Sequence, residues 1–173
     1  MNHKLQVIQE LCKDIHLLYV EDEDDLREIM VTYLNKFFPH IDSATNGEEG
    51  INLYKKNQYD LVITDILMPK LNGIEMATEI KNMNEQQNII IISAYSDTKD
   101  FIESIKLGID GYVLKPIDFE QLNSILFKIA EKIHTYKENI EYQKNLEQLV
   151  LKKTENIQQL EDAKVENYKE TIY

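Results

Sequence analysis

Four places in the sequence carry polar side chains that could do chemistry together. A short apolar run precedes each of them, and the four places are Glu21-Asp22, Asp65, Ser93 and Lys115. Three carboxylates that lie close together repel one another, so a site that contains them needs a cation. Oxygen ligands with room for water suit Mg²⁺. With Lys115 as a fixed positive charge and Ser93 as a hydroxyl donor, the set fits phosphoryl transfer, in which Asp65 is the nucleophile that forms an aspartyl phosphate.

The elements that would position these side chains alternate regularly along the chain. Apolar runs predict strands, and apolar residues at helical spacing predict helices between them. Connections too long for hairpins predict a parallel, doubly wound α/β sheet that is covered on both faces, so that the polar strand ends gather in one crevice. The strands are expected at 15–20, 41–44, 61–63, 89–92 and 112–114, and the helices at about 26–38, 47–57, 74–83 and 97–107.

Local signals set the limits of these elements. Pro39 is expected to end the first of the four helices, and Asp24 or Asp25 to cap its beginning. Before the first strand, apolar residues at helical spacing predict either a short helix or a docking arm in residues 1–13. The single cysteine, Cys12, lies in this pattern, which predicts a buried thiol and excludes an internal disulfide.

Composition narrows the function classes. The net charge of -12 argues against a general nucleic-acid binder, and no basic cluster stands out. No apolar run approaches the roughly 18 residues of a membrane span, and the polar N-terminus has no signal-peptide core. We therefore expect a soluble cytoplasmic protein without a membrane or nucleic-acid partner.

The ordered set of polar residues resembles the receiver domain of two-component response regulators. The resemblance covers roughly residues 14–133 and implies a flavodoxin-like sheet with strand order 2-1-3-4-5. Successive members of the series Asp22, Asp65, Ser93 and Lys115 are 43, 28 and 22 residues apart, as in that family. The residues that carry the resemblance are Glu21-Asp22, Asp65 in the segment DILMPKLNG, Ser93-Ala94, Tyr112 and Lys115-Pro116.

This resemblance implies a magnesium-dependent phosphoacceptor. Asp65 would accept a phosphoryl group from a histidine kinase or phosphotransfer protein. Asp22 and Asp65 would bind Mg²⁺, together with the backbone carbonyl of Leu67, and Glu21 would act through water. Lys115 would bind a phosphoryl oxygen.

The resemblance also implies a switch. Ser93 would bind a phosphoryl oxygen and move toward it, and Tyr112 would turn into the space that Ser93 leaves. The face formed by the fourth helix, fifth strand and fifth helix of the domain would then shift. The Lys115-Pro116 peptide bond would be cis.

Two further positions bear on the lifetime of the phosphoryl group. Leu67 is two residues after Asp65, and Tyr95 is two residues after Ser93, where a hydrolytic water would approach. Neither side chain is a carboxylate or amide that would readily orient water. We therefore expect a long-lived phosphoryl group.

Residues 134–173 are expected to continue the last helix of the domain as a coiled coil. Neither Gly nor Pro occurs between Phe119 and Tyr173. One apolar stripe ends near Ile140 and another begins near Leu146, so the seam has an irregularity. A long polar helix is marginal alone, which predicts a parallel homodimer, and a partly disordered tail is the alternative. The stripes consist of Leu122, Ile125, Ile129, Ile133, Tyr136 and Ile140, and then Leu146, Leu149, Val150, Ile157 and Leu160.

Two other functions are alternatives to a phosphoaccepting receiver. A Mg²⁺-dependent phosphatase of the haloacid dehalogenase type also uses a nucleophilic Asp at a strand end, but that class expects a second Asp where this chain has Leu67. A degenerate receiver that only binds partners is disfavoured by the intact Asp65 and Lys115.

Receivers followed by a long helix such as the one expected at residues 134–173 resemble the front parts of larger signalling proteins, whose outputs include cyclases, phosphodiesterases and kinases. No output motif is evident in these residues, so either the chain is a fragment or the helix itself is the output.

Overall fold

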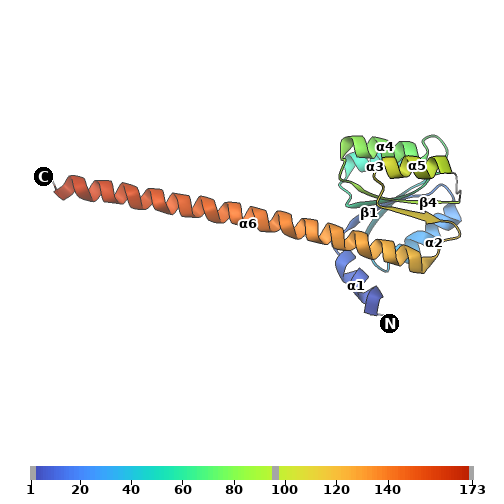
Figure 1. The fold of residues 1–173 in the computed structure, drawn as a ribbon, viewed down its shortest axis with the longest axis horizontal. Helices are drawn as coiled ribbons and strands as arrows, with labels where there is room; N and C mark the ends of the chain where they lie inside the picture. Colours follow the sequence, from blue (N-terminus) through green and yellow to red (C-terminus); the bar gives the residue numbers. More distant parts are fainter. Residues whose placement is uncertain (1–2, 95–97, 172–173) are drawn as a thin grey trace. The chain divides into compact units, whose positions relative to one another are not determined.

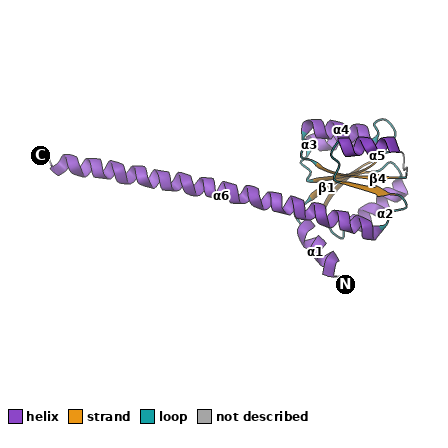
Figure 2. Ribbon diagram, viewed as in Figure 1, coloured by secondary structure: helices purple, strands orange, loops and turns teal. Residues whose placement is uncertain are grey.

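The computed structural model describes residues 3–94 and 98–171 of the chain. The chain divides into two compact units, residues 1–133 and residues 134–173. The first unit contains a parallel sheet with helices on both faces, which Figures 1 and 2 show as two layers of helices with the strands between them. The second unit is the continuation of the last helix, α6, whose bounds are Phe119–Thr171.

The five strands are all parallel and lie in the order β2-β1-β3-β4-β5, which confirms the predicted doubly wound sheet. Thr64 of β3 pairs with Val20 of β1, and Asp65 pairs with Ile92 of β4. This register brings the C-terminal ends of the three central strands level, so the residues that follow them lie at one edge. The strands are β1 His16–Val20, β2 His40–Ala44, β3 Leu61–Asp65, β4 Asn88–Ser93 and β5 Gly111–Leu114.

Helices cover both faces of the sheet (Figure 1). One apolar cluster joins α1, α2 and residues 122–133 of α6 to alternate residues of the strands. The opposite strand faces pack mainly against α3 and α4. Both faces of the central strands are therefore buried, which explains why their sequences are continuous apolar runs. The other helices are α1 His3–Cys12, α2 Asp24–Leu34, α3 Gly47–Lys56, α4 Gly73–Met83 and α5 Thr98–Lys106.

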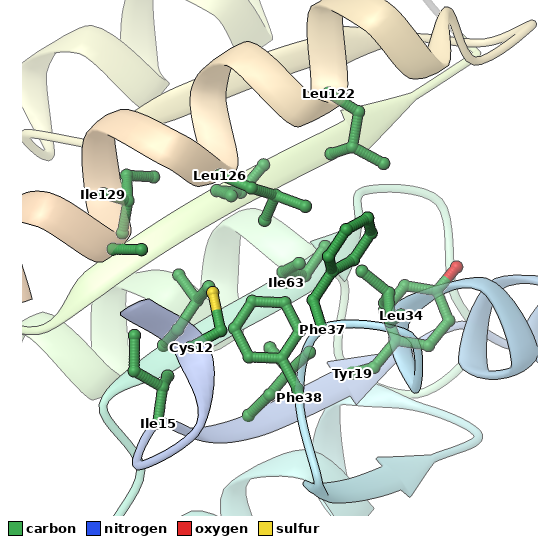
Figure 3. Close-up of a cluster of buried hydrophobic side chains, with 14 of the residues drawn as sticks. Cys12, Ile15, Tyr19, Leu34, Phe37, Phe38, Ile63, Leu122, Leu126 and Ile129 are labelled. Carbon is green, nitrogen blue, oxygen red and sulfur yellow. The ribbon is translucent and has the colours of Figure 1, made fainter. Parts of the chain in front are cut away.

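The N-terminal residues form a helix that packs into the core. Ile8 and Cys12 of α1 are fully buried in the cluster that contains residues 122–133 of α6, and Figure 3 shows Cys12 among these side chains. The Nζ of Lys4 donates to the Oγ of Ser124 in α6 at 3.0 Å. The predicted buried thiol is confirmed, and burial raises the pKa of Cys12 to about 12.

Helix α2 differs from its prediction at both ends. It ends at Leu34 rather than near Phe38, because the amide N–H groups of Phe37 and Phe38 both donate to the carbonyl of Leu34, which turns the chain. The two phenylalanines enter the core from this turn, so their apolar spacing was misread as one more helical turn. The cap prediction was also wrong. Glu23 is the N-cap, without a side-chain hydrogen bond, and Asp24 lies in the first turn.

The second unit, residues 134–173, is helical as far as it is described, and its side chains are mostly exposed. Its apolar residues contact no other element within the unit because the unit is one helix. Within 3–94 and 98–171, no helix is both long enough and apolar enough to cross a membrane. The large exposed apolar residues of this unit are Tyr136, Tyr142, Leu146, Leu149, Val150, Leu151, Ile157, Leu160, Val165 and Tyr168.

The burial of α1 generates a stability prediction. Replacing Ile8 with Ala should lower the free energy of unfolding by about 2–5 kcal/mol, because it leaves a cavity in the shared core. The matched control is Ile29→Ala, since Ile29 lies on α2 and its side chain is 59% exposed. That change should stay within about 0.5 kcal/mol. Urea unfolding of both variants measures the difference, and equal effects would mean that α1 does not pack as described.

Candidate functional site

An acid pocket, defined as Glu21, Asp22 and Asp65, lies at the C-terminal edge of the sheet. One carboxylate oxygen from each residue lies within 4.8 Å of the others. Glu21 is only 1% exposed and Asp65 only 6%, whereas Asp22 is open to solvent. The level ends of β1 and β3 create this arrangement, because Glu21 and Asp22 directly follow β1 and Asp65 is the last residue of β3. Three acids at this spacing form an oxygen-rich site that suits a hard divalent cation.

Lys115 joins the acid pocket from the end of β5. Its Nζ donates to the Oε2 of Glu21 at 2.9 Å and to the Oδ2 of Asp65 at 2.8 Å. Burial alone would lower the pKa of Lys115, but the hydrogen bonds to Asp65 and Glu21 outweigh it and raise that pKa. The ammonium therefore stays charged between the two acids. The Lys115-Pro116 peptide bond is cis, as expected.

Glu21 carries a buried carboxylate in this pocket, and its surroundings raise its pKa. Burial raises its pKa, the nearby Asp65 raises it further, and the hydrogen bond from Lys115 opposes both. Its Oε1 also accepts a longer bond, 3.3 Å, from the amide of Glu23. Glu21 thus depends on Lys115 as its main partner, because a buried carboxylate without a cation or donors is strongly unfavourable.

The backbone around Asp65 is closely packed. Its Oδ1 accepts a 2.6 Å hydrogen bond from the amide of Ile66. A Cβ on Gly73 would lie 1.9 Å from the carbonyl oxygen of Asp65, so only glycine fits where α4 begins against this strand. Asn72 caps α4 in a capping box with Glu75, which fixes the start of the helix. The turn residues after Asp65 therefore hold the end of β3 in place.

The other predicted site residues lie around this edge. Ser93 is buried at the end of β4, and its carbonyl accepts a 2.8 Å bond from the amide of Lys115. Tyr112 is half-buried on β5, and its ring meets that of Phe101 of α5 edge-on at 5.3 Å. The Leu67 side chain is 54% exposed. Tyr95 lies outside the described residues.

Sequence reasoning missed two residues beside the acid pocket. Arg27 of α2 donates from Nη1 to the carbonyl oxygen of Glu21 at 2.8 Å and pairs with Asp24. Tyr19 of β1 is 1% exposed, and burial raises its pKa, with Glu21 and then Asp65 adding to this effect. The available signal was the strand alternation, which places residue 19 on the same side of β1 as residue 21.

Comparison with known proteins agrees with this geometry. The family model of the response regulator receiver domain matches residues 17–127. The probable transcriptional regulator ycf27 of Cyanidium caldarium is 35% identical over 120 residues, which is 69% of this chain and 48% of that protein. Response regulator ArlR of Staphylococcus aureus (strain Mu50 / ATCC 700699) is 35% identical over 106 residues, covering 61% of this chain and 48% of ArlR.

Among the solved structures that resemble the chain are two with more than 30% sequence identity to it. The N-terminal domain of an uncharacterized protein from Wolinella succinogenes has 39% identity and a TM-score of 0.63, covering 71% of this chain and 96% of that one. Response regulator protein TrrA from Thermotoga maritima, crystallised in complex with Mg²⁺-BeF, has 35% identity and a TM-score of 0.61, covering 66% of this chain and 98% of TrrA.

The fold and the acid pocket thus define a receiver-type α/β domain. More specifically, the chain belongs to the response regulator receiver domain family of two-component systems. It spans about half the length of the curated relatives that it matches.

Proposed function

We propose that this receiver accepts a phosphoryl group on Asp65 from a histidine kinase or a phosphotransfer protein. The observation that carries the proposal is the position of Lys115, whose ammonium bonds both Glu21 and Asp65 inside a cluster of three acids. A pocket with a buried nucleophile, a fixed cation and an oxygen-rich metal site has the parts that phosphoryl transfer requires.

The acid pocket fits Mg²⁺ as its cofactor. Asp22, Asp65 and the backbone carbonyl of Leu67 would bind the ion, and Glu21 would act through water. A bound Mg²⁺ would neutralise charge on the acids and on the phosphoryl oxygens. The exposure of Asp22 supports this assignment, because Mg²⁺ keeps several of its waters and needs an open side to hold them.

The transfer itself leaves the pocket with a new arrangement of charge. A bond forms between a carboxylate oxygen of Asp65 and phosphorus while the bond from phosphorus to the donor breaks. Lys115, which now contacts Asp65, would then bind a phosphoryl oxygen, and the hydroxyl of Ser93 would bind another. The burial of Ser93 at the adjacent strand end supports its role.

The switch would act through Tyr112 on the face formed by α5, β5 and α6. Tyr112 packs edge-on against Phe101, so a turn of Tyr112 toward Ser93 would remove a contact that holds α5. Phe101, Ile102 and Ile105 of α5 are partly exposed, which gives this face an apolar surface that can change. A local charge event is thereby converted into a change of packing.

We also propose that residues 134–173 form a parallel homodimeric coiled coil that transmits the signal from the domain at residues 14–133. A helix that exposes so many large apolar side chains has a strong tendency to pair. The identity of any output beyond this helix is outside the proposal.

Phosphorylation can be tested by intact-mass measurement with acetyl phosphate and Mg²⁺. We expect one adduct of about 80 Da, the mass of a phosphoryl group, which is absent in Asp65→Asn and after chelation of Mg²⁺. Turnover of free phosphate ester without an adduct would instead indicate a phosphatase. A chain that forms no adduct under these conditions would be a binding module, and the proposal would be wrong.

The lifetime of the adduct tests the role of Leu67. Because an apolar side chain at position 67 does not orient water, Leu67→Asn should hydrolyse the phosphoryl group faster, by roughly tenfold or more. Decay is followed by mass after acetyl phosphate is removed. The control is Leu67→Met, which stays apolar and should decay like the wild type. Equal decay of all three proteins contradicts the assigned role of Leu67.

The homodimer is tested by light scattering across a range of protein concentrations. Ile157→Lys should weaken association roughly tenfold or more, because it removes an apolar contact from the proposed seam. The matched control is Asn156→Lys, which adds the same charge at the neighbouring position outside the seam and should change association little. A wild-type mass equal to one chain at every concentration would refute the coiled coil.

A further inference from the structure

The side chain of Tyr19 carries a buried hydroxyl. Within residues 3–94 and 98–171, this hydroxyl neither donates a hydrogen bond nor accepts one, although it is shielded from solvent. The ring belongs to the apolar cluster on the side of the sheet covered by α2 and α6. Figure 3 shows the oxygen at the margin of this cluster, on the side away from Cys12. A phenylalanine would fill the same space without the unpaired group.

This hydroxyl lies next to the acid pocket. Tyr19 and Glu21 are two residues apart at the end of β1, so they share one side of the strand. The hydroxyl is near enough to Glu21 for a hydrogen-bonding contribution from that carboxylate, together with the charges of Glu21 and Asp65, to raise its pKa beyond the effect of burial. Its geometry among the described residues nevertheless falls short of a full hydrogen bond to either carboxylate. A tyrosine hydroxyl can rotate its proton to suit a new acceptor, so only a small shift is needed.

Glu21 is the acceptor that would need this donor. Its carboxylate is held now by Lys115 at 2.9 Å and by the longer bond from the amide of Glu23 at 3.3 Å. Arg27 is engaged elsewhere, by the carbonyl of Glu21 and by Asp24. If Lys115 turns toward a phosphoryl oxygen, Glu21 loses its main partner while it stays buried.

We propose that Tyr19 is a positioning residue, whose hydroxyl donates to the Glu21 carboxylate when Lys115 turns to the phosphoryl group. The inference rests on the proposed function, which supplies the movement of Lys115. The hydroxyl is unpaired in the resting arrangement and paired in the phosphorylated one, so it favours the phosphorylated state. It also holds Glu21 in place at the edge of the metal site after its salt bridge has opened.

The test compares wild type with Tyr19→Phe in the full 173-residue chain. Beryllofluoride with Mg²⁺ serves as the phosphoryl mimic, and its affinity is measured by calorimetry. Loss of a hydrogen bond to a charged group should weaken that affinity roughly tenfold. The free energy of unfolding without beryllofluoride should be unchanged or higher, because the hydroxyl is unpaired there.

Two controls separate this role from a structural one. Tyr59→Phe removes a hydroxyl that donates to Asp42 at 2.6 Å. Tyr59 lies just before the N-terminal end of β3, at the edge of the sheet opposite to the acid pocket. It should lower stability and leave beryllofluoride affinity unchanged. In a Glu21→Gln background, Tyr19→Phe should change the affinity less than about threefold, because the charged acceptor is gone. The NMR signal of the hydroxyl-bearing carbon of Tyr19 should also shift when beryllofluoride binds.

The outcomes distinguish the two proposals. If wild type forms the adduct and binds beryllofluoride, and Tyr19→Phe binds it equally well, the role of Tyr19 is refuted while the proposed function stands. A loss of stability in unliganded Tyr19→Phe would also refute it, because the hydroxyl would already be paired. If wild type forms no adduct and binds no beryllofluoride, the proposed function fails, and the inference about Tyr19 fails with it.

Discussion

The ion pair of Lys115 with Glu21 and Asp65 is the constraint on which the rest of the structure depends. Two of the three acids are buried, and buried carboxylates at this distance are tolerated only beside a cation. The three charged groups come from β1, β3 and β5, so the pairing requires those strand ends to be level. A parallel sheet with short strands satisfies this requirement, and the close approach of Gly73 to the end of β3 keeps it satisfied.

The sequence predicted the sheet and the members of the site because both depend on local signals. Short apolar runs fix the strands, and parallel topology then gathers whatever polar residues follow them. The end of α2 was mispredicted because Phe37 and Phe38 satisfy a helical spacing while lying in a turn. The hydrogen-bond partners of Arg27 and the unpaired state of the Tyr19 hydroxyl among the described residues could not be predicted either, because they depend on side-chain directions that no spacing specifies.

The docking of the N-terminal helix α1 could likewise not be predicted from the sequence. Its apolar face was recognisable, but whether it docks depends on a surface contributed by the end of α2 and by α6. Both α1 and residues 128–133 of α6 lie outside the part of the chain that the family model matches, yet Ile8, Ile129 and Ile133 share one cluster. The core of the first unit therefore extends beyond residues 17–127, and α1 packs with apolar residues of α6 up to Ile133, where the first unit ends.

This extended core affects how a change in the pocket can reach α6. The strand that carries Tyr112 and leads to Lys115 touches α6 closely, because a Cβ on Gly111 would lie only 2.6 Å from Ile125. Just before this strand, Asp110 binds the amide of Ile89 and pairs with Lys132 of α6 at 2.7 Å. Residues 119–133 of α6 are thus held by β5 on one side and by α1 on another. A movement of β5 would either carry this part of the helix along or break contacts with it, so the packing of α1 would couple residues 119–133 of α6 to the strand that precedes Lys115.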